Sequence, residues 1–215
     1  MKVIDLTHLM TQDMPLFPGT EPVKLERMAD YEGDGFRETQ LTFTSHTGTH
    51  MDAPRHVFGD KISLDALPAE QFVGTGLVID CRSVEEGGII GMEFVDNVRE
   101  AADAADFLLF CTGWDRYWGE DAYFSEYPVI SMEVCQYLLD SGKKGVGFDT
   151  IGIDAVADGD LPRHRKLLSE RDIVIIENLT HLEEVGGSLF RFAALPLKYQ
   201  EADGAPVRAL AIAEE

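Results

Sequence analysis

Residues 45–56 read SHTGTHMDAPRH. Four ionisable side chains of this stretch all stand at even-numbered positions: His46, His50, Asp52 and His56. On a helix His46 and His50 share a face, but Asp52 points about 200° away from His50 at roughly 100° per residue. A straight strand puts all four on one face, yet it separates the ends of the set by about 33 Å. We therefore predict an extended segment that bends at Gly48 and Pro54 and folds its polar face around one point.

A divalent metal ion is the natural occupant of that point, because imidazole and carboxylate groups are common metal ligands. The alternative interpretation is a structural hydrogen-bond cluster without a metal. The helical zinc-protease pattern H-E-x-x-H is absent from the stretch. Cysteine ligands are absent from it too, so a finger-type structural zinc site is not indicated.

The whole chain has 215 residues, of which 45% are hydrophobic and 27% charged, as expected for one folded domain spanning residues 1–215. The net charge of −21 argues against nucleic acid or an anionic membrane as a partner. Cys81, Cys111 and Cys135 are widely spaced among apolar neighbours, which favours buried reduced thiols. No signal peptide and no apolar run of about 20 residues is evident, so we expect a cytoplasmic protein.

Apolar runs and turn residues predict a mixed α/β fold with βαβ units. Strands are expected at 3–6, 36–44, 76–81, 106–114, 145–150, 172–179, 188–199 and 206–213. Helical segments are expected at 63–72, 91–104, 131–142 and 162–170. The segment 14–22 contains Pro15, Pro18 and Pro22, so it is predicted to be an irregular loop.

The stretch HTGTHMDAPRH matches the H-x-G-T-H-x-D-x-P-x-H signature of the cyclase family, which includes bacterial kynurenine formamidase (arylformamidase) and the isatin hydrolases. The resemblance extends over DLTHLMTQDMPLFPG, GVGFDTIGID, RHRKLLSERDIVIIENL and FAALPLKYQEADGAPVRALA, and so covers nearly the whole chain. It implies the swivelling β/β/α fold of that family. It also implies a homodimer or homotetramer.

The resemblance assigns a first metal to His46, His50 and Asp52, and a second to His164 and Glu177 with Asp52 bridging. From the residues alone, Glu177 ends an apolar strand and needs a cation or donors if it is buried. His164 is equally compatible with a surface position between two arginines. Zinc is the expected ion, manganese is the next candidate, and one or two ions per chain are expected.

Three further residues receive roles that stay open. His56 is expected to act in general acid–base catalysis, with metal ligation as the alternative. Phe17 is expected against the substrate by resemblance, or else as an anchor of its loop. Trp114 opens the aromatic-rich segment 114–127, which is interpreted as a substrate pocket wall, a dimer contact or a packed loop. Asp149 and Asp154 lie in FDTIGID and are candidates for orienting the metal ligands. Without the resemblance, the preferred role of Asp154 is to form a turn or to cap a helix.

Together these features predict a metal-dependent hydrolase that cleaves a carbon–nitrogen amide bond of a small aromatic amide, such as an arylformamide or a cyclic aryl amide. The same machinery serves a lactone or an ester. The rival hypothesis from another class is a catalytically idle metal-binding or assembly protein that keeps the fold.

Overall fold

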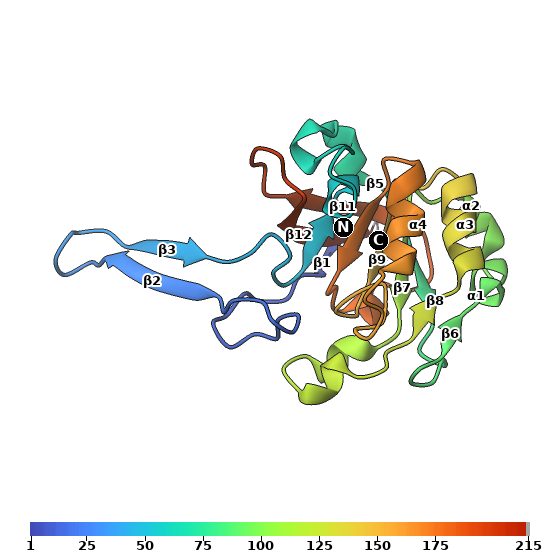
Figure 1. The fold of residues 1–215 in the computed structure, drawn as a ribbon, viewed down its shortest axis with the longest axis horizontal. Helices are drawn as coiled ribbons and strands as arrows, with labels where there is room; N and C mark the ends of the chain where they lie inside the picture. The colour runs from blue at the N-terminus through green and yellow to red at the C-terminus, as the bar shows by residue number, and fades with distance from the viewer. Residues whose placement is uncertain (214–215) are drawn as a thin grey trace.

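The computed structural model describes residues 1–213, and its centre is a rolled sheet (Figure 1). Its strands follow the order β1-β12-β11-β5-β7-β9-β10-β4, and β4 also pairs with β12, which closes a ring of seven strands. These strands are β1 (Lys2–Asp5), β4 (His50–Asp52), β5 (Val73–Asp80), β7 (Phe107–Cys111), β9 (Gly145–Phe148), β10 (Val174–Glu177), β11 (Phe190–Pro196) and β12 (Gly204–Ala213). The pairing of β4 with both β10 and β12 places the histidine motif inside this closure.

The strands β5, β7, β9 and β10 are mutually parallel, as the predicted βαβ units require. The helices between them cover the outer face: α1 (Met92–Asp96), α2 (Arg99–Ala104), α3 (Met132–Asp140) and α4 (Pro162–Glu170). Ser131 caps α3 by accepting a hydrogen bond from Val134 N at 3.2 Å, in agreement with the predicted helix start. The expected helix over 91–104 is broken at Asn97 and Val98, both weak helix formers, into α1 and α2.

Two hydrophobic cores occupy the two faces of the parallel strands. Phe107, Leu109 and Cys111 belong to the core within the ring, whereas Leu108 and Phe110 belong to the core shared with the helices. Strand β10 divides in the same way, because side chains alternate between the faces of a strand. Burial on both faces explains why these strands are continuous apolar runs in the sequence.

A two-stranded arm extends away from the rest of the molecule (Figure 1). It consists of β2 (Lys24–Ala29) and β3 (Glu38–Thr42), which pair only with each other among the described residues. Every residue of β3 is exposed. The predicted strand 36–44 therefore exists, but it leads into the histidine motif from outside the main sheet, and its partner β2 was not predicted.

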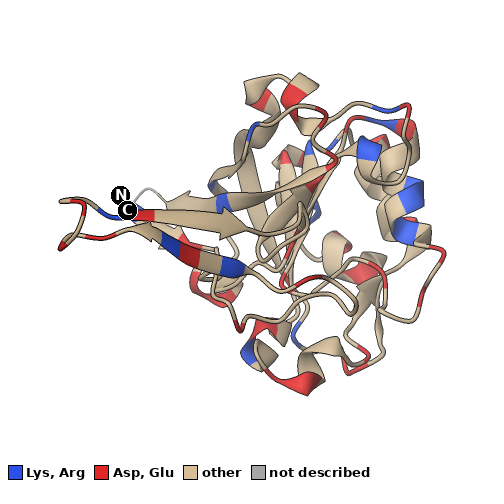
Figure 2. Cartoon of the chain, turned by 60° about the vertical axis from the view of Figure 1, so that its left-hand side comes forward, with Lys and Arg blue, Asp and Glu red and all other residues tan. Residues whose placement is uncertain are grey.

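Short elements complete the chain: β6 (Ile89–Ile90), β8 (Val129–Ile130), η1 (Pro54–His56), η2 (Leu64–Ala66), η3 (Ala69–Phe72), η4 (Trp114–Tyr117), η5 (Asp121–Phe124) and η6 (Leu182–Glu184). Acidic residues are spread over the arm, the loops and the helices rather than forming one block (Figure 2). In the part of the chain that the structure describes, none of the helices is long and apolar enough to cross a bilayer.

Candidate metal centre

The histidine motif is extended and bent, as its spacing predicted. Gly48 adopts φ +63°, which turns the chain into β4, and Pro54 begins the short helix η1. In register, His50 lies opposite Glu177 of β10, and Asp52 lies opposite Gly204 of β12. The strand thus brings residues from the middle and the end of the chain to one point.

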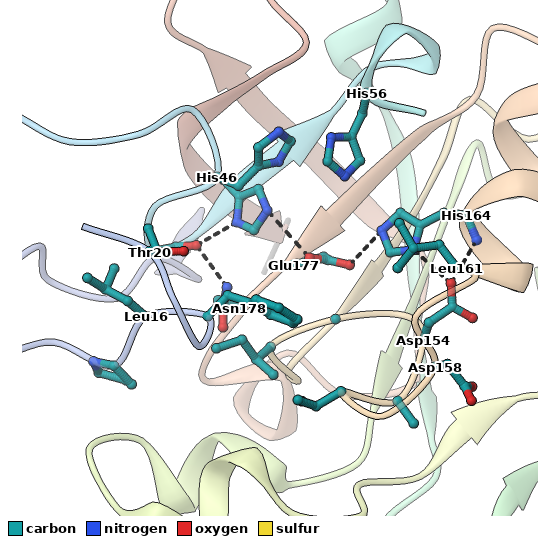
Figure 3. A pocket seen from close by; sticks show the side chains of 18 of the residues that line it. Leu16, Thr20, His46, His56, Asp154, Asp158, Leu161, His164, Glu177 and Asn178 are labelled. Carbon is teal, nitrogen blue, oxygen red and sulfur yellow. Dashed lines mark hydrogen bonds and ion pairs between the residues drawn. The ribbon is translucent and has the colours of Figure 1, made fainter. Parts of the chain in front are cut away.

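His50 and His164 direct the same ring nitrogen toward this point. His50 Nδ1 lies 2.8 Å from the Gly48 carbonyl oxygen, and His164 Nδ1 lies 2.8 Å from Asp154 Oδ2. A hydrogen bond from Nδ1–H to such an acceptor leaves Nε2 free as a ligand, which is the usual arrangement around metal-binding histidines. His50 Nε2 is 3.4 Å from Asp52 Oδ1. His164 Nε2 is 3.3 Å from Glu177 Oε1, as Figure 3 shows.

Two buried carboxylates lie between these imidazoles. Glu177 Oε2 is 3.4 Å from His50 Nε2, while its Oε1 also accepts a hydrogen bond from Ile153 N at 2.8 Å. Asp52 is fully buried, and its Oδ2 accepts no hydrogen bond from residues 1–213 although it lies 3.4 Å from His164 Nε2. A buried carboxylate oxygen without a donor is costly unless a cation neutralises it, and a metal ion meets that need.

His46 lies between the carboxylate of Asp52, in the same motif, and that of Asp203, near the end of the chain. Its Nδ1 is 2.7 Å from Asp52 Oδ1, and its Nε2 is 3.0 Å from Asp203 Oδ2. Gly204 makes this approach feasible, because a Cβ at that position would lie 2.4 Å from His46 Cε1. Asp203 can therefore orient His46 from the side opposite to Asp52.

His56 stands beside this cluster on η1 and is only half-buried. Its ring centroid is 4.0 Å from that of His46 and 5.7 Å from that of His164. Figure 3 shows His56 next to His46, across the site from His164. This position is compatible with either proton transfer or metal ligation.

The carboxylates and imidazoles of the cluster shift one another's pKa values. Burial lowers the pKa of His46, but the Asp52 and Asp203 carboxylates outweigh burial and raise the pKa to about 9. Burial likewise opposes a charge on His50, yet Asp52 and Glu177 raise the pKa of this imidazole to about 10. Burial favours neutral Asp52, but the surrounding histidines hold its pKa well below the ordinary value. His56 differs from His46 and His50, because burial lowers the pKa of its imidazole and the nearby carboxylates do not outweigh that effect.

The donor set fits one or two divalent ions. Among the described residues, two groups of side chains each place their ligand atoms within 4.8 Å of one another. One group is His46, Asp52 and His56, and the other is His50, Asp52 and Glu177. Both groups share Asp52, the residue expected to bridge. In these groups His56 lies with His46, and His50 contacts both Asp52 and Glu177, so the expected division of the ligands between two ions stays a prediction. His164 lies against the second group and is buried, not on the surface.

A cavity of about 490 Å³ opens above the cluster and is walled mainly by apolar side chains. Phe17 lines this cavity and is 46% exposed, so its ring is available to a bound molecule. Trp114 does not line it. The Trp114 side chain is 4% exposed and packs with Tyr123 and Tyr127 in an aromatic core, where its Nε1 donates to the Tyr123 carbonyl oxygen. Among the interpretations of segment 114–127, the packed loop describes Trp114.

Sequence reasoning missed two residues of the site. Asp203 contacts His46, and Asn178 Nδ2 donates to the Gly48 carbonyl oxygen at 2.9 Å, which supports the bend of the motif. Both stand in segments that resemble the cyclase family, but neither position is marked by spacing. Asp154 orients His164, one of the alternatives considered for it, whereas Asp149 holds the turn at Thr112 and Gly113.

Comparison with known proteins agrees with this geometry. Residues 4–155 match a family model described as "Putative cyclase". Kynurenine formamidase of Bacillus mycoides is 29% identical over 208 residues, covering 96% of this chain and 95% of that protein. Isatin hydrolase A from Ralstonia solanacearum superposes with a TM-score of 0.87 at 25% identity, covering 99% of this chain and 92% of that one.

A further solved structure is described as a potential metal-dependent hydrolase with cyclase activity. It is 29% identical, has a TM-score of 0.80, and the match covers 100% of this chain and 98% of that chain. The family match spans most of the chain, and these relatives share its fold from end to end. The chain therefore belongs to the cyclase family and is a metal-dependent hydrolase.

Proposed function

We propose that the protein hydrolyses a carbon–nitrogen amide bond of an aryl substrate, either an arylformamide such as N-formylkynurenine or a cyclic aryl amide. The observation that carries this proposal is the cluster of inward-facing imidazoles and two buried carboxylates at the base of an apolar cavity. The names of the similar kynurenine formamidase and isatin hydrolase support the same class of reaction.

Hydrogen bonds within the protein orient two of the expected ligand residues. Gly48 and Asp154 hold the Nδ1 atoms of His50 and His164, so both Nε2 atoms point inward. Zinc is the ion we expect, with manganese as the alternative, because nitrogen and carboxylate ligands suit both. When bound, such an ion would polarise the carbonyl group of the substrate and lower the pKa of a bound water molecule.

His56 is the proton carrier in this proposal. Burial lowers the pKa of its imidazole, and His56 lines the cavity beside the ligand cluster. A neutral imidazole at this place accepts a proton from the attacking water and returns it to the departing amine nitrogen. An amide needs this second transfer, because an amine anion is a poor leaving group.

The test compares metal-stripped protein with protein reloaded with zinc or manganese on an N-formyl arylamine, isatin, a formylated aliphatic amine and a nitrophenyl ester. We expect activity only after reloading, with a higher kcat/KM for the aryl than for the aliphatic formamide. Asp52→Ala should lose metal and activity together. His181→Ala is the matched control, because the exposed His181 contacts the Asp5 carbonyl oxygen away from the cavity.

Undiminished turnover by metal-stripped protein would refute the proposal. Metal binding without turnover of any compound would support the idle metal-binding protein instead. Turnover of the nitrophenyl ester alone would point to an ester or lactone hydrolase.

A further inference from the structure

Away from the histidine cluster, no lysine or arginine among the described residues lines the cavity. Away from the ligand cluster its wall is largely apolar and includes Leu16, Phe17, Ile151, Val156 and Leu161. Proteins bind carboxylate groups chiefly through arginine or lysine, so this wall provides no counter-charge for an anionic substituent.

The cation nearest in sequence to this wall is already engaged. Arg163 Nε donates to the Ile130 carbonyl oxygen at 2.6 Å, and Arg163 Nη1 donates to Asp154 Oδ1 at 3.1 Å. The Arg163 side chain is only 11% exposed and does not line the cavity. Its guanidinium is therefore held in place as a structural tie rather than presented to a ligand.

Asp158 adds a negative charge to the wall. Asp158 is one of the residues that line the cavity, near Asp154 and Leu161 and at the far side from His46 (Figure 3), and its side chain remains 46% exposed. Its one ion pair within the described part of the chain is the long contact of 3.4 Å between Asp158 Oδ2 and Arg163 Nη1, an arginine that Asp154 already neutralises. A carboxylate on the substrate would approach this charge without compensation, whereas an ammonium group would be attracted.

We propose, on the basis of the hydrolase function proposed above, that the site takes aryl amides that are neutral or cationic at the end remote from the scissile bond. Asp158 is the residue that sets this preference. Substrates with a carboxylate at that end are disfavoured, even when the reacting amide and the ring are the same. Within the class proposed above, N-formylkynurenine carries such a carboxylate beside an ammonium group, so we expect it to be a poorer substrate than a neutral formanilide or a neutral cyclic aryl amide. This defines a narrower substrate class than aryl amides in general.

The test uses three formanilides with a para substituent: carboxymethyl, carbamoylmethyl and aminomethyl. The methylene group insulates the ring, so the reacting amide is electronically similar in all three. With metal-loaded protein we expect kcat/KM for the carbamoylmethyl compound to exceed that for the carboxymethyl compound about tenfold, a modest penalty for like charges a few ångströms apart. The aminomethyl compound should match or exceed the neutral one.

Asp158→Asn should reduce the ratio of kcat/KM between the carbamoylmethyl and carboxymethyl compounds from about tenfold to about threefold or less. Asp160→Asn should leave this ratio unchanged. Asp160 is the matched control, because it lies in the same loop and carries the same charge but does not line the cavity. Raising the salt concentration should narrow the wild-type ratio as well, because salt screens partly exposed charges.

A carboxymethyl compound that is hydrolysed as well as the neutral one, or a ratio that Asp158→Asn leaves intact, would overturn the inference. If the protein hydrolyses none of the three compounds, that result would instead refute the proposed function. In that case calorimetric Kd values of the same compounds, compared between Asp158→Asn and Asp160→Asn, still decide the charge preference.

Discussion

Replacing Asp154 by asparagine tests whether His164 is held ready for a metal. Asp154 Oδ2 lies 2.8 Å from His164 Nδ1 and 3.1 Å from His164 N, and Asp154 Oδ1 lies 2.9 Å from Arg163 N. All three partners are donors. Asparagine has one acceptor oxygen, so one side of this contact must face an NH₂ group, and the charge that fixes the His164 tautomer is lost.

The size of the effect follows from these contacts. A hydrogen bond to a charged group contributes about 1.5–3 kcal/mol, and loss of an orienting partner typically weakens metal binding about 10–100-fold. The two ranges agree, because a factor of ten corresponds to about 1.4 kcal/mol. We therefore expect Asp154→Asn to weaken zinc binding by His164 and Glu177 about 10–100-fold. The affinity for zinc at a site that depends on His46 should change much less.

The assay is a competition titration of metal-free protein with zinc and a chromogenic chelator, together with the thermal midpoint of the metal-free protein. Asp160→Asn again serves as the control for loss of one acidic charge in this loop. Zinc affinity that is unchanged in Asp154→Asn would refute the reasoning. An equal loss at every zinc site, with a lowered thermal midpoint, would refute it too, because it would show a general folding defect.

Four shorter predictions follow from the same geometry. His56→Ala should retain its metal and lose about 10²–10⁴-fold in kcat/KM on an anilide, with a smaller loss on a nitrophenyl ester. Reduced metal content, with equal losses of kcat/KM on both substrates, would instead make His56 a metal ligand. Zinc binding at pH 7 should release protons, because His46 and His50 have pKa values of about 9 and about 10 without metal, and affinity should therefore rise with pH. Calorimetry in buffers of different ionisation enthalpy measures this release, and buffer-independent heats would contradict it. Gly204→Ala should displace the His46 ring and weaken metal binding, since the new Cβ would lie 2.4 Å from His46 Cε1, and unchanged metal affinity would show that the ring can move freely. Phe36→Asp on the exposed arm should shift the expected homo-oligomer toward monomer in sedimentation experiments, because a lone two-stranded hairpin is marginally stable in water; a monomeric wild type would contradict this.

The sequence by itself determined the local features of this protein. The parity of His46, His50, Asp52 and His56 required an extended, bent segment, and the structure has one. Apolar runs predicted the parallel strands, because strands buried on both faces carry apolar residues at every position. The start of the helix at Pro162 was equally predictable, since proline is well tolerated at the first turn.

Only the tertiary structure decided which distant groups meet. Asp203 reaches His46 across 157 positions, and Glu177 lies opposite His50 because β4 pairs with β10 in one register. A slip of one residue would turn every side chain of β4 to the other face, and no pattern within the motif fixes that register. The burial of Trp114 is of the same kind, because an aromatic-rich loop has the same composition whether it packs inward or lines a cavity.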